Sequence, residues 1–265
     1  MTEARGVATF GVALGLMTLA ARSRAAEGPG DTQTLPCRPT IACTADFVPP
    51  GAFELEAGYQ YRRLAGNQRQ SSFPFLAKLT LDRWVQAQVG SNGYTAVQGP
   101  TALHYFDNVS LGAKLHFFDQ GRLMPSVSFS AAVSVPTVAD PGYVRATDLL
   151  AIAYVTKDVG PIHADFNVGW NQFGGDSGAL SQQWVALALS ASLPAPFGVM
   201  VENYYFTDAA PLASRDGGAL FAVSHAPRPW LTFDLGGDVG YFPGTRAFSA
   251  FFGMSIVPFL VWNEQ

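Results

Sequence analysis

The stretch FELEAGYQYR, residues 53–62, alternates strictly between two kinds of side chain. Its odd-numbered residues are apolar, and its even-numbered residues are charged, polar or glycine. Successive side chains of a β-strand point to opposite faces, so a period of two over this length predicts a strand with one apolar and one polar face. A soluble sheet and a membrane-spanning barrel both produce this pattern, and the rest of the chain has to distinguish them.

Composition and the first residues indicate an exported protein without a nucleic-acid partner. Of the 265 residues only 14% are charged, against about 25% in ordinary globular proteins. The formal net charge of −4 is mild, and there is no stripe of Lys and Arg. The apolar run from Val7 to Ala21 follows Arg5 and precedes small residues, which predicts a secretory signal peptide over residues 1–25. The alternative, a transmembrane anchor, needs about 20 apolar residues, and this run is shorter.

Residues 26–50 are predicted to be an irregular periplasmic segment, because they are rich in Pro, Gly and Thr. The two cysteines of the chain, Cys37 and Cys43, lie in this segment, in CRPTIAC. An oxidising compartment favours a small disulfide loop between them. With two cysteines and no nearby pair of histidines, no metal site is expected.

After residue 50 the alternation recurs and predicts twelve strands. Their approximate ranges are 52–62, 73–81, 84–91, 108–118, 123–135, 147–156, 161–170, 183–193, 197–206, 217–225, 230–241 and 247–258. The assignment of faces is left open for 149–155 and 219–225. Short, turn-rich connections alternate with longer ones at 63–72, 92–107, 136–146, 171–182 and 207–216. This order is typical of outer-membrane barrels, with short periplasmic turns and longer outer loops.

The predicted fold class is therefore all-β: a transmembrane antiparallel up-and-down β-barrel of about 12 strands, covering residues 51–265, in the outer membrane. Aromatic residues near strand ends suit interfacial girdles, and twelve strands enclose a bore wider than side chains fill in an eight-stranded barrel. A soluble β-protein with the apolar face inside is the alternative. The C-terminal run 248–262 is short for a spanning helix and contains Pro258, so it is predicted to be the closing strand that pairs with 52–62.

Several stretches carry a family resemblance over about residues 50–258. GAFELEAGYQY, LTLDRWVQAQVG, TDLLAIAYVTKDVGPIHADFNVGW and VMVENYY resemble the outer-membrane transporter family named for the MetA-pathway of phenol degradation. The resemblance implies an outer-membrane β-barrel that passes hydrophobic or aromatic small molecules, and it implies no catalytic residues. The CRPTIAC segment lies outside the shared region.

If the polar faces point inward, charged side chains line the lumen and define candidate constriction residues. They are Glu54, Glu56, Lys78, Lys114, His163, Asp165, Glu202, Asp234 and Asp238. Two interpretations stay open: an acidic wall facing a basic one that sets ion preference, or ion pairs such as Glu54 or Glu56 with Lys78 that only neutralise buried charge. Because acids outnumber bases in this set, an open pore is expected to prefer cations.

No enzyme is predicted, since no motif for a nucleophile, a phosphate loop or a zinc protease is present, and no histidine has a serine two positions on. No cofactor is expected. The predicted function is passive passage of small solutes, hydrophobic or aromatic ones included. The alternative is a non-conducting structural or surface-interaction barrel. Membrane lipid and a small solute are the expected partners, and the oligomeric state is left open.

Overall fold

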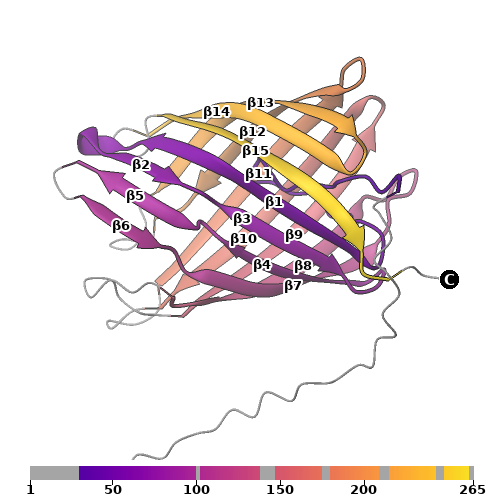
Figure 1. Ribbon diagram of the computed structural model, residues 1–265, viewed down its shortest axis with the longest axis horizontal. Coiled ribbons are helices and arrows are strands. Elements are labelled where there is room, and N and C mark those ends of the chain that lie inside the picture. Colours follow the sequence, from indigo (N-terminus) through magenta and orange to yellow (C-terminus); the bar gives the residue numbers. More distant parts are fainter. Residues whose placement is uncertain are drawn as a thin grey trace, which may run out of the picture.

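The computed structural model describes residues 30–99, 102–137, 147–174, 180–208, 215–242 and 248–262. The predicted signal peptide, residues 1–25, lies outside these ranges. Within them, one antiparallel sheet of fifteen strands closes on itself, because β15 (Phe248–Leu260) pairs with β1 (Ala52–Arg63) (Figure 1). Among the described residues no helix is both long enough and apolar enough to cross a membrane.

Twelve of these strands make the wall, each antiparallel to its neighbours. They are β1, β3 (Phe75–Thr80), β4 (Val85–Ser91), β7 (Val109–Phe118), β8 (Ser126–Val135), β9 (Asp148–Val159), β10 (Ile162–Phe173), β11 (Leu180–Ser192), β12 (Phe197–Phe206), β13 (Asp216–Arg228), β14 (Leu231–Gly240) and β15. Every strand after β7 pairs with the next one along the chain, as in an up-and-down meander. The twelve-stranded barrel predicted from the alternation is confirmed, including its closure by the last strand.

The short connections all lie at one end of the barrel. They are residues 81–84, 119–125, 160–161, 193–196 and 229–230. We call this the short-turn end, and the opposite one the long-loop end. Because outer-membrane barrels keep their short turns on the periplasmic side, the long-loop end is the outer one.

Three short strands that the sequence analysis assigned to loops extend the wall at the long-loop end. They are β2 (Arg69–Ser72), β5 (Tyr94–Gln98) and β6 (Leu103–Phe106), and a single 3-10 turn, η1 (Ala65–Asn67), precedes β2. β1 continues past β3 to pair with β2, and β2 pairs with β5. Gly93, with φ +64°, separates β4 from β5, and a Cβ there would lie 2.1 Å from the Phe73 carbonyl oxygen. A strand of four or five residues next to a turn of this kind is too short to show a recognisable alternation of apolar and polar side chains.

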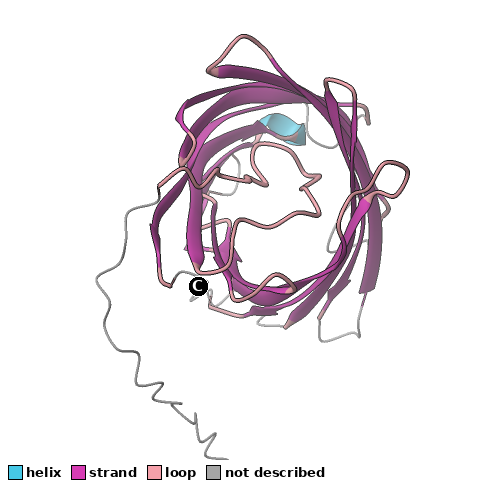
Figure 2. Cartoon of the chain, turned by 90° about the vertical axis from the view of Figure 1, so that its right-hand side faces the viewer, coloured by secondary structure: helices cyan, strands magenta, loops and turns pink. Residues whose placement is uncertain are grey.

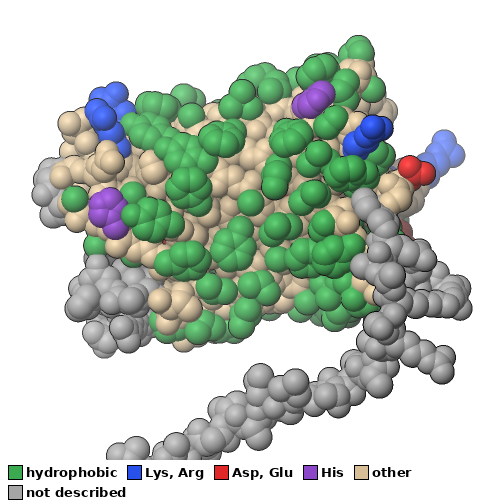
Figure 3. All heavy atoms as spheres, viewed as in Figure 1, with side chains coloured by type: hydrophobic (Ala, Val, Ile, Leu, Met, Phe, Trp, Pro, Cys, Tyr) green, Lys and Arg blue, Asp and Glu red, His purple; other side chains and the backbone are tan. Residues whose placement is uncertain are grey.

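In the strands that alternate clearly, the apolar face points outward, as predicted. Leu235 and Phe252 are 60% and 56% exposed on the outer surface, whereas Glu54 and Glu56 are fully buried inside. The face left open for 149–155 is also settled, because Leu149 is exposed outside and Tyr154 is buried inside. Figure 3 shows hydrophobic side chains across the middle of one side of the barrel, with charged side chains toward its two ends. This is the surface expected of a barrel embedded in lipid.

Candidate functional site

Residues 33–48, which we call the plug segment, lie inside the barrel at its short-turn end (Figure 2). The segment starts beside the β13–β14 turn, where the Thr34 N–H donates to the Pro229 carbonyl at 2.9 Å. It returns through Pro49 and Pro50 to the start of β1. It forms no strand, and its prolines have no N–H for a ladder. The sequence predicts an irregular segment here but gives no sign that it lies in the lumen.

A buried cluster of three charges holds the first part of the plug segment. Lys78 Nζ lies 2.7 Å from a Glu54 carboxylate oxygen and 2.6 Å from one of Glu56. Glu54 also accepts the Leu35 N–H at 2.8 Å, and Glu56 accepts the Cys37 N–H at 2.9 Å and the N–H of the next residue at 3.0 Å. Lys78 in turn donates to the Leu35 carbonyl at 2.8 Å. The ion pairs considered from the sequence are therefore present, and the same groups bind the plug backbone.

Glu202 of β12 and Asn167 of β10 hold the tip of the plug segment. Glu202 accepts hydrogen bonds from the N–H groups of Ile41 and Ala42, at 2.9 and 2.6 Å. The Asn167 side chain accepts the Cys43 N–H at 2.6 Å and donates to the Cys43 carbonyl at 3.0 Å. Asn167 thus pairs with Cys43 much as a neighbouring strand would, which satisfies both backbone groups inside the lumen.

Lys114 of β7 contacts the returning half of the plug segment. Its ammonium donates a hydrogen bond to the Thr44 carbonyl. It also lies 4.3 Å from the centroid of the Tyr154 ring and 5.4 Å from that of Phe47. A carbonyl and two aromatic faces therefore surround this buried cation, an arrangement that stabilises a charge removed from water.

Asp165 and His163 of β10 contact the plug segment less directly. Asp165 accepts a hydrogen bond from the Thr156 hydroxyl at 2.5 Å, and the same hydroxyl oxygen accepts the Ala45 N–H at 2.7 Å. His163 bridges two carboxylates, with Nδ1 2.6 Å from Asp158 and Nε2 3.3 Å from Asp165. Asp165 therefore positions the hydroxyl that binds the plug segment, and His163 links it to the end of β9.

The two acidic residues of β14 have different neighbours. Asp234 accepts hydrogen bonds from the Arg38 guanidinium, with Nε at 3.3 Å and Nη2 at 3.4 Å. Asp238, farther from the short-turn end, accepts hydrogen bonds from the Ser249 hydroxyl at 2.8 Å and the Tyr204 hydroxyl at 3.1 Å. Asp234 thus anchors a side chain of the plug segment, while these two bonds tie Asp238 to the wall.

The predicted disulfide between Cys37 and Cys43 is confirmed and closes the tip of the plug segment into a small loop. Ala42 in this loop packs with the buried side chains of Trp184 and Tyr204, which point inward from β11 and β12, and Ile41 packs against the same cluster. The tip is therefore apolar where it meets the wall, whereas its backbone is held by polar side chains.

Of the nine charged residues picked out from the sequence, six contact the plug segment directly: Glu54, Glu56, Lys78, Lys114, Glu202 and Asp234. Their grouping in the half of the barrel near the short turns follows from strand direction. Other contacts with the segment involve residues outside this set of nine, among them Asn167, Thr156 and Arg38. Arg38 lies outside the barrel strands and Thr156 ends a strand whose face was left open, so alternation gave no signal for either.

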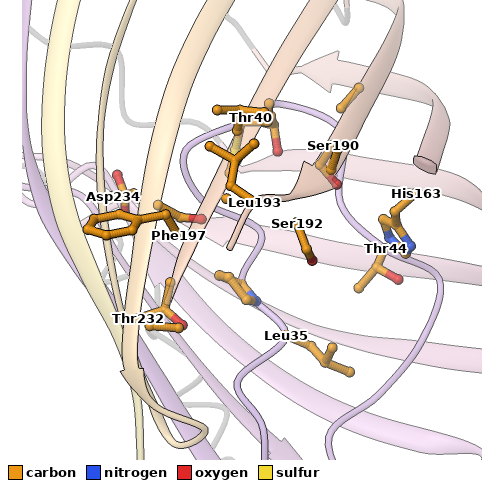
Figure 4. Close-up of a pocket in the computed structure, with 18 of the residues that line it drawn as sticks. Leu35, Thr40, Thr44, His163, Ser190, Ser192, Leu193, Phe197, Thr232 and Asp234 are labelled. Carbon is orange, nitrogen blue, oxygen red and sulfur yellow. The ribbon is translucent and has the colours of Figure 1, made fainter. Parts of the chain in front are cut away.

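A cavity of about 750 Å³ remains between the plug segment and the wall formed by β10–β14 (Figure 4). Hydroxyl groups of Ser190, Ser192 and Thr232 line it, together with the apolar side chains of Leu193 and Phe197. The plug segment contributes Leu35, Thr40 and Thr44 from the other side. The segment therefore does not fill the lumen at the short-turn end.

Comparisons with known proteins bear on the fold. No protein-family model matches the chain, and no curated protein matches it. Among solved structures, it is similar to the COG4313 outer membrane channel from Pseudomonas putida F1, with a TM-score of 0.60 and 10% identity, over 87% of this chain and 99% of that one. The translocator domain of the autotransporter NalP from Neisseria meningitidis gives a TM-score of 0.47 at 10% identity, over 77% and 88% of the two chains.

Fold and surface together define the class of this protein. A closed barrel of antiparallel strands, with an apolar outer face, a polar inner face and short turns gathered at one end, is an outer-membrane β-barrel. The chain is therefore located in the outer membrane.

Proposed function

We propose that this protein is an outer-membrane channel for the passive passage of small solutes, and that the plug segment restricts its lumen. One observation carries the proposal: the short-turn end is occupied by a separate piece of chain, residues 33–48, beside which a cavity of about 750 Å³ persists. A twelve-stranded wall is too wide for its own side chains to fill. The route for a solute runs beside the plug segment, along β10–β14.

The lining of the cavity supports a neutral, hydrophobic or aromatic solute. Its hydroxyl groups and apolar side chains offer weak hydrogen bonds and contact area. The charged side chains at the edge of the cavity are paired, Arg38 with Asp234 and His163 with Asp165. They are therefore not available to bind an ion that enters the cavity. The resemblance to the MetA-pathway transporter family points the same way, and membership of that family is part of the proposal.

A non-conducting barrel is the competing function, and the anchoring of the plug segment favours it. Side chains from β1, β3, β7, β9, β10, β12 and β14 bind the segment, so it is held from many sides of the wall. If the segment never moves and the cavity ends blindly above it, the barrel conducts nothing.

Single-channel recording of the refolded mature chain in a planar bilayer tests the proposal. We expect discrete current steps with cation preference, because acidic residues outnumber basic ones around the lumen. Ser190→Trp, which places a large ring in the cavity, is expected to lower the conductance. Leu189→Trp is the matched control, because Leu189 is the adjacent residue of β11 and points outward.

Two results contradict the proposal. The first is silence from protein shown to be folded, both with the plug segment and after deletion of residues 33–48, which would assign a structural role. The second is conductance that Ser190→Trp and Leu189→Trp leave equally unchanged, which would place the route elsewhere. Clear anion preference would refute only the expected cation preference and would leave the proposed channel function standing.

A further inference from the structure

Two arginines face each other on the outer surface of the barrel at the long-loop end. Arg63, the last residue of β1, pairs in register with Arg69, the first residue of β2. Both are exposed. Arg63 lies on the outward face, since it has the same parity as Tyr59 and Tyr61, and cross-strand partners share a face.

Among the described residues no carboxylate forms an ion pair with either arginine. The next partner in the same row is uncharged, because Arg69 pairs with Gln98 of β5. Like charges directly opposite each other destabilise a sheet. Two adjacent guanidinium groups with no carboxylate partner in the described part of the chain therefore favour an anion supplied from outside it.

The level of the pair relative to the membrane identifies the region from which that anion comes. One step below Arg63 on the outward face, the Tyr61 ring packs 5.9 Å from that of Phe248. One step further, the Tyr59 ring lies 5.6 Å from Phe252 and 5.3 Å from Phe73. Aromatic residues at this position mark the boundary of the apolar band. At about 3.4 Å per residue, Arg63 stands roughly 7 Å beyond Tyr61, at the level of the lipid head groups.

Figure 3 shows this arrangement on one side of the barrel. Lys and Arg side chains gather at the left-hand end, over the region of β1 and β2, directly beside the hydrophobic side chains of the band. The long-loop end is the outer one, so these head groups belong to the outer leaflet.

We propose that Arg63 and Arg69 form a binding site for the phosphate groups of lipopolysaccharide in the outer leaflet. A guanidinium donates two parallel hydrogen bonds to a phosphate, and two adjacent guanidinium groups neutralise its double charge. The aromatic side chains below then contact the first part of the acyl chains. The site is independent of the lumen and of the proposed channel.

Native mass spectrometry of the full mature chain with bis-phosphorylated lipid A tests the site. We expect Arg63→Gln with Arg69→Gln to weaken binding by about tenfold or more, since each guanidinium makes charge-assisted hydrogen bonds. Arg83→Gln with Arg228→Gln is the matched control. Both of its arginines are exposed, and both lie at the short-turn end.

Two further ligands separate the possible sources of the anion. Lipid A stripped of its phosphates is expected to bind the parent and the Arg63/Arg69 variant equally. Millimolar inorganic phosphate is expected not to displace lipid A, because the acyl chains contribute to binding. Equal loss in the control variant, or full binding by the Arg63/Arg69 variant shown to be folded, would overturn the site.

Discussion

Lys78 links the charged cluster of the wall to the plug segment. It neutralises two buried carboxylates and also donates to the backbone of the segment. We expect Lys78→Met to destabilise the folded protein by about 3–5 kcal/mol, because it leaves two buried charges without a partner. Urea unfolding followed by the electrophoretic shift of the folded barrel measures this change.

The triple variant Glu54→Gln, Glu56→Gln, Lys78→Met is the control for that experiment. It removes the charges together, so it is expected to recover part of the lost stability. If Lys78→Met unfolds at the same urea concentration as the parent, the cluster does not stabilise the barrel.

Asn167 offers a residue-scale test of the docking of the plug segment itself. Asn167→Ala removes both hydrogen bonds to Cys43 and weakens docking by about 1–3 kcal/mol. Hydrogen exchange read by mass spectrometry is expected to show faster exchange in peptides covering 33–48. Asn171→Ala is the control, because Asn171 lies on the same face of β10 and donates to Gln182. Equal acceleration in both variants would refute a specific contact.

At the scale of elements, removing the disulfide between Cys37 and Cys43 tests how the tip of the plug segment keeps its conformation. Cys37→Ser with Cys43→Ser opens a loop with a sequence separation of 6. The chain-entropy model gives roughly 2 kcal/mol for a loop of this size. We expect the variant to release the segment more often, seen as faster hydrogen exchange over 33–48 and, for an open channel, more frequent current steps.

Dithiothreitol applied to the parent is expected to reproduce that behaviour and to have no effect on the double variant. An unchanged exchange rate in the variant would mean that the wall contacts alone hold the tip.

At the scale of elements, the strands could be predicted from the sequence and the plug segment could not. Alternation located the wall strands with ends within about three residues, because each strand has lipid on one side and the lumen on the other. The sequence analysis missed β2, β5 and β6, because they are short and lie beside turns such as the one at Gly93. The plug segment has no periodicity, since its backbone is paired with side chains rather than with a strand.

Some members of the candidate site were predictable from the sequence, but their role was not. Glu54, Lys78 and Glu202 lie on the polar faces of their strands, so the alternation marks them as lumen residues. In the structure, the register of β1 and β3 places Glu54 opposite Lys78. A carboxylate accepts a hydrogen bond from any N–H within reach. No local pattern therefore shows that Glu202 binds the backbone of residues 41 and 42, more than 150 positions earlier in the chain.

At the scale of the whole molecule, the outer surface sets the stability of the barrel in the bilayer. Leu235→Arg places a charge on the lipid face, where Leu235 is 60% exposed. We expect a loss of about 2–4 kcal/mol if this position lies near the bilayer midplane. Refolding into lipid vesicles followed by guanidinium titration measures the loss. Leu123→Arg in the 119–125 turn, where Leu123 is 88% exposed, is expected to change little. Similar losses for both would contradict the assignment of the apolar surface to lipid.

The position of the plug segment in the chain has a consequence for biogenesis. The segment precedes every wall strand, yet its partners lie from 18 residues away, at Glu56, to 214 residues away, at Phe252. These partners surround a common lumen only after β14 and β15 have joined the sheet. Contacts this distant form slowly, because a long loop must close before they are made. The plug segment is synthesised before every wall strand, yet it is therefore the last of these parts to reach its native position.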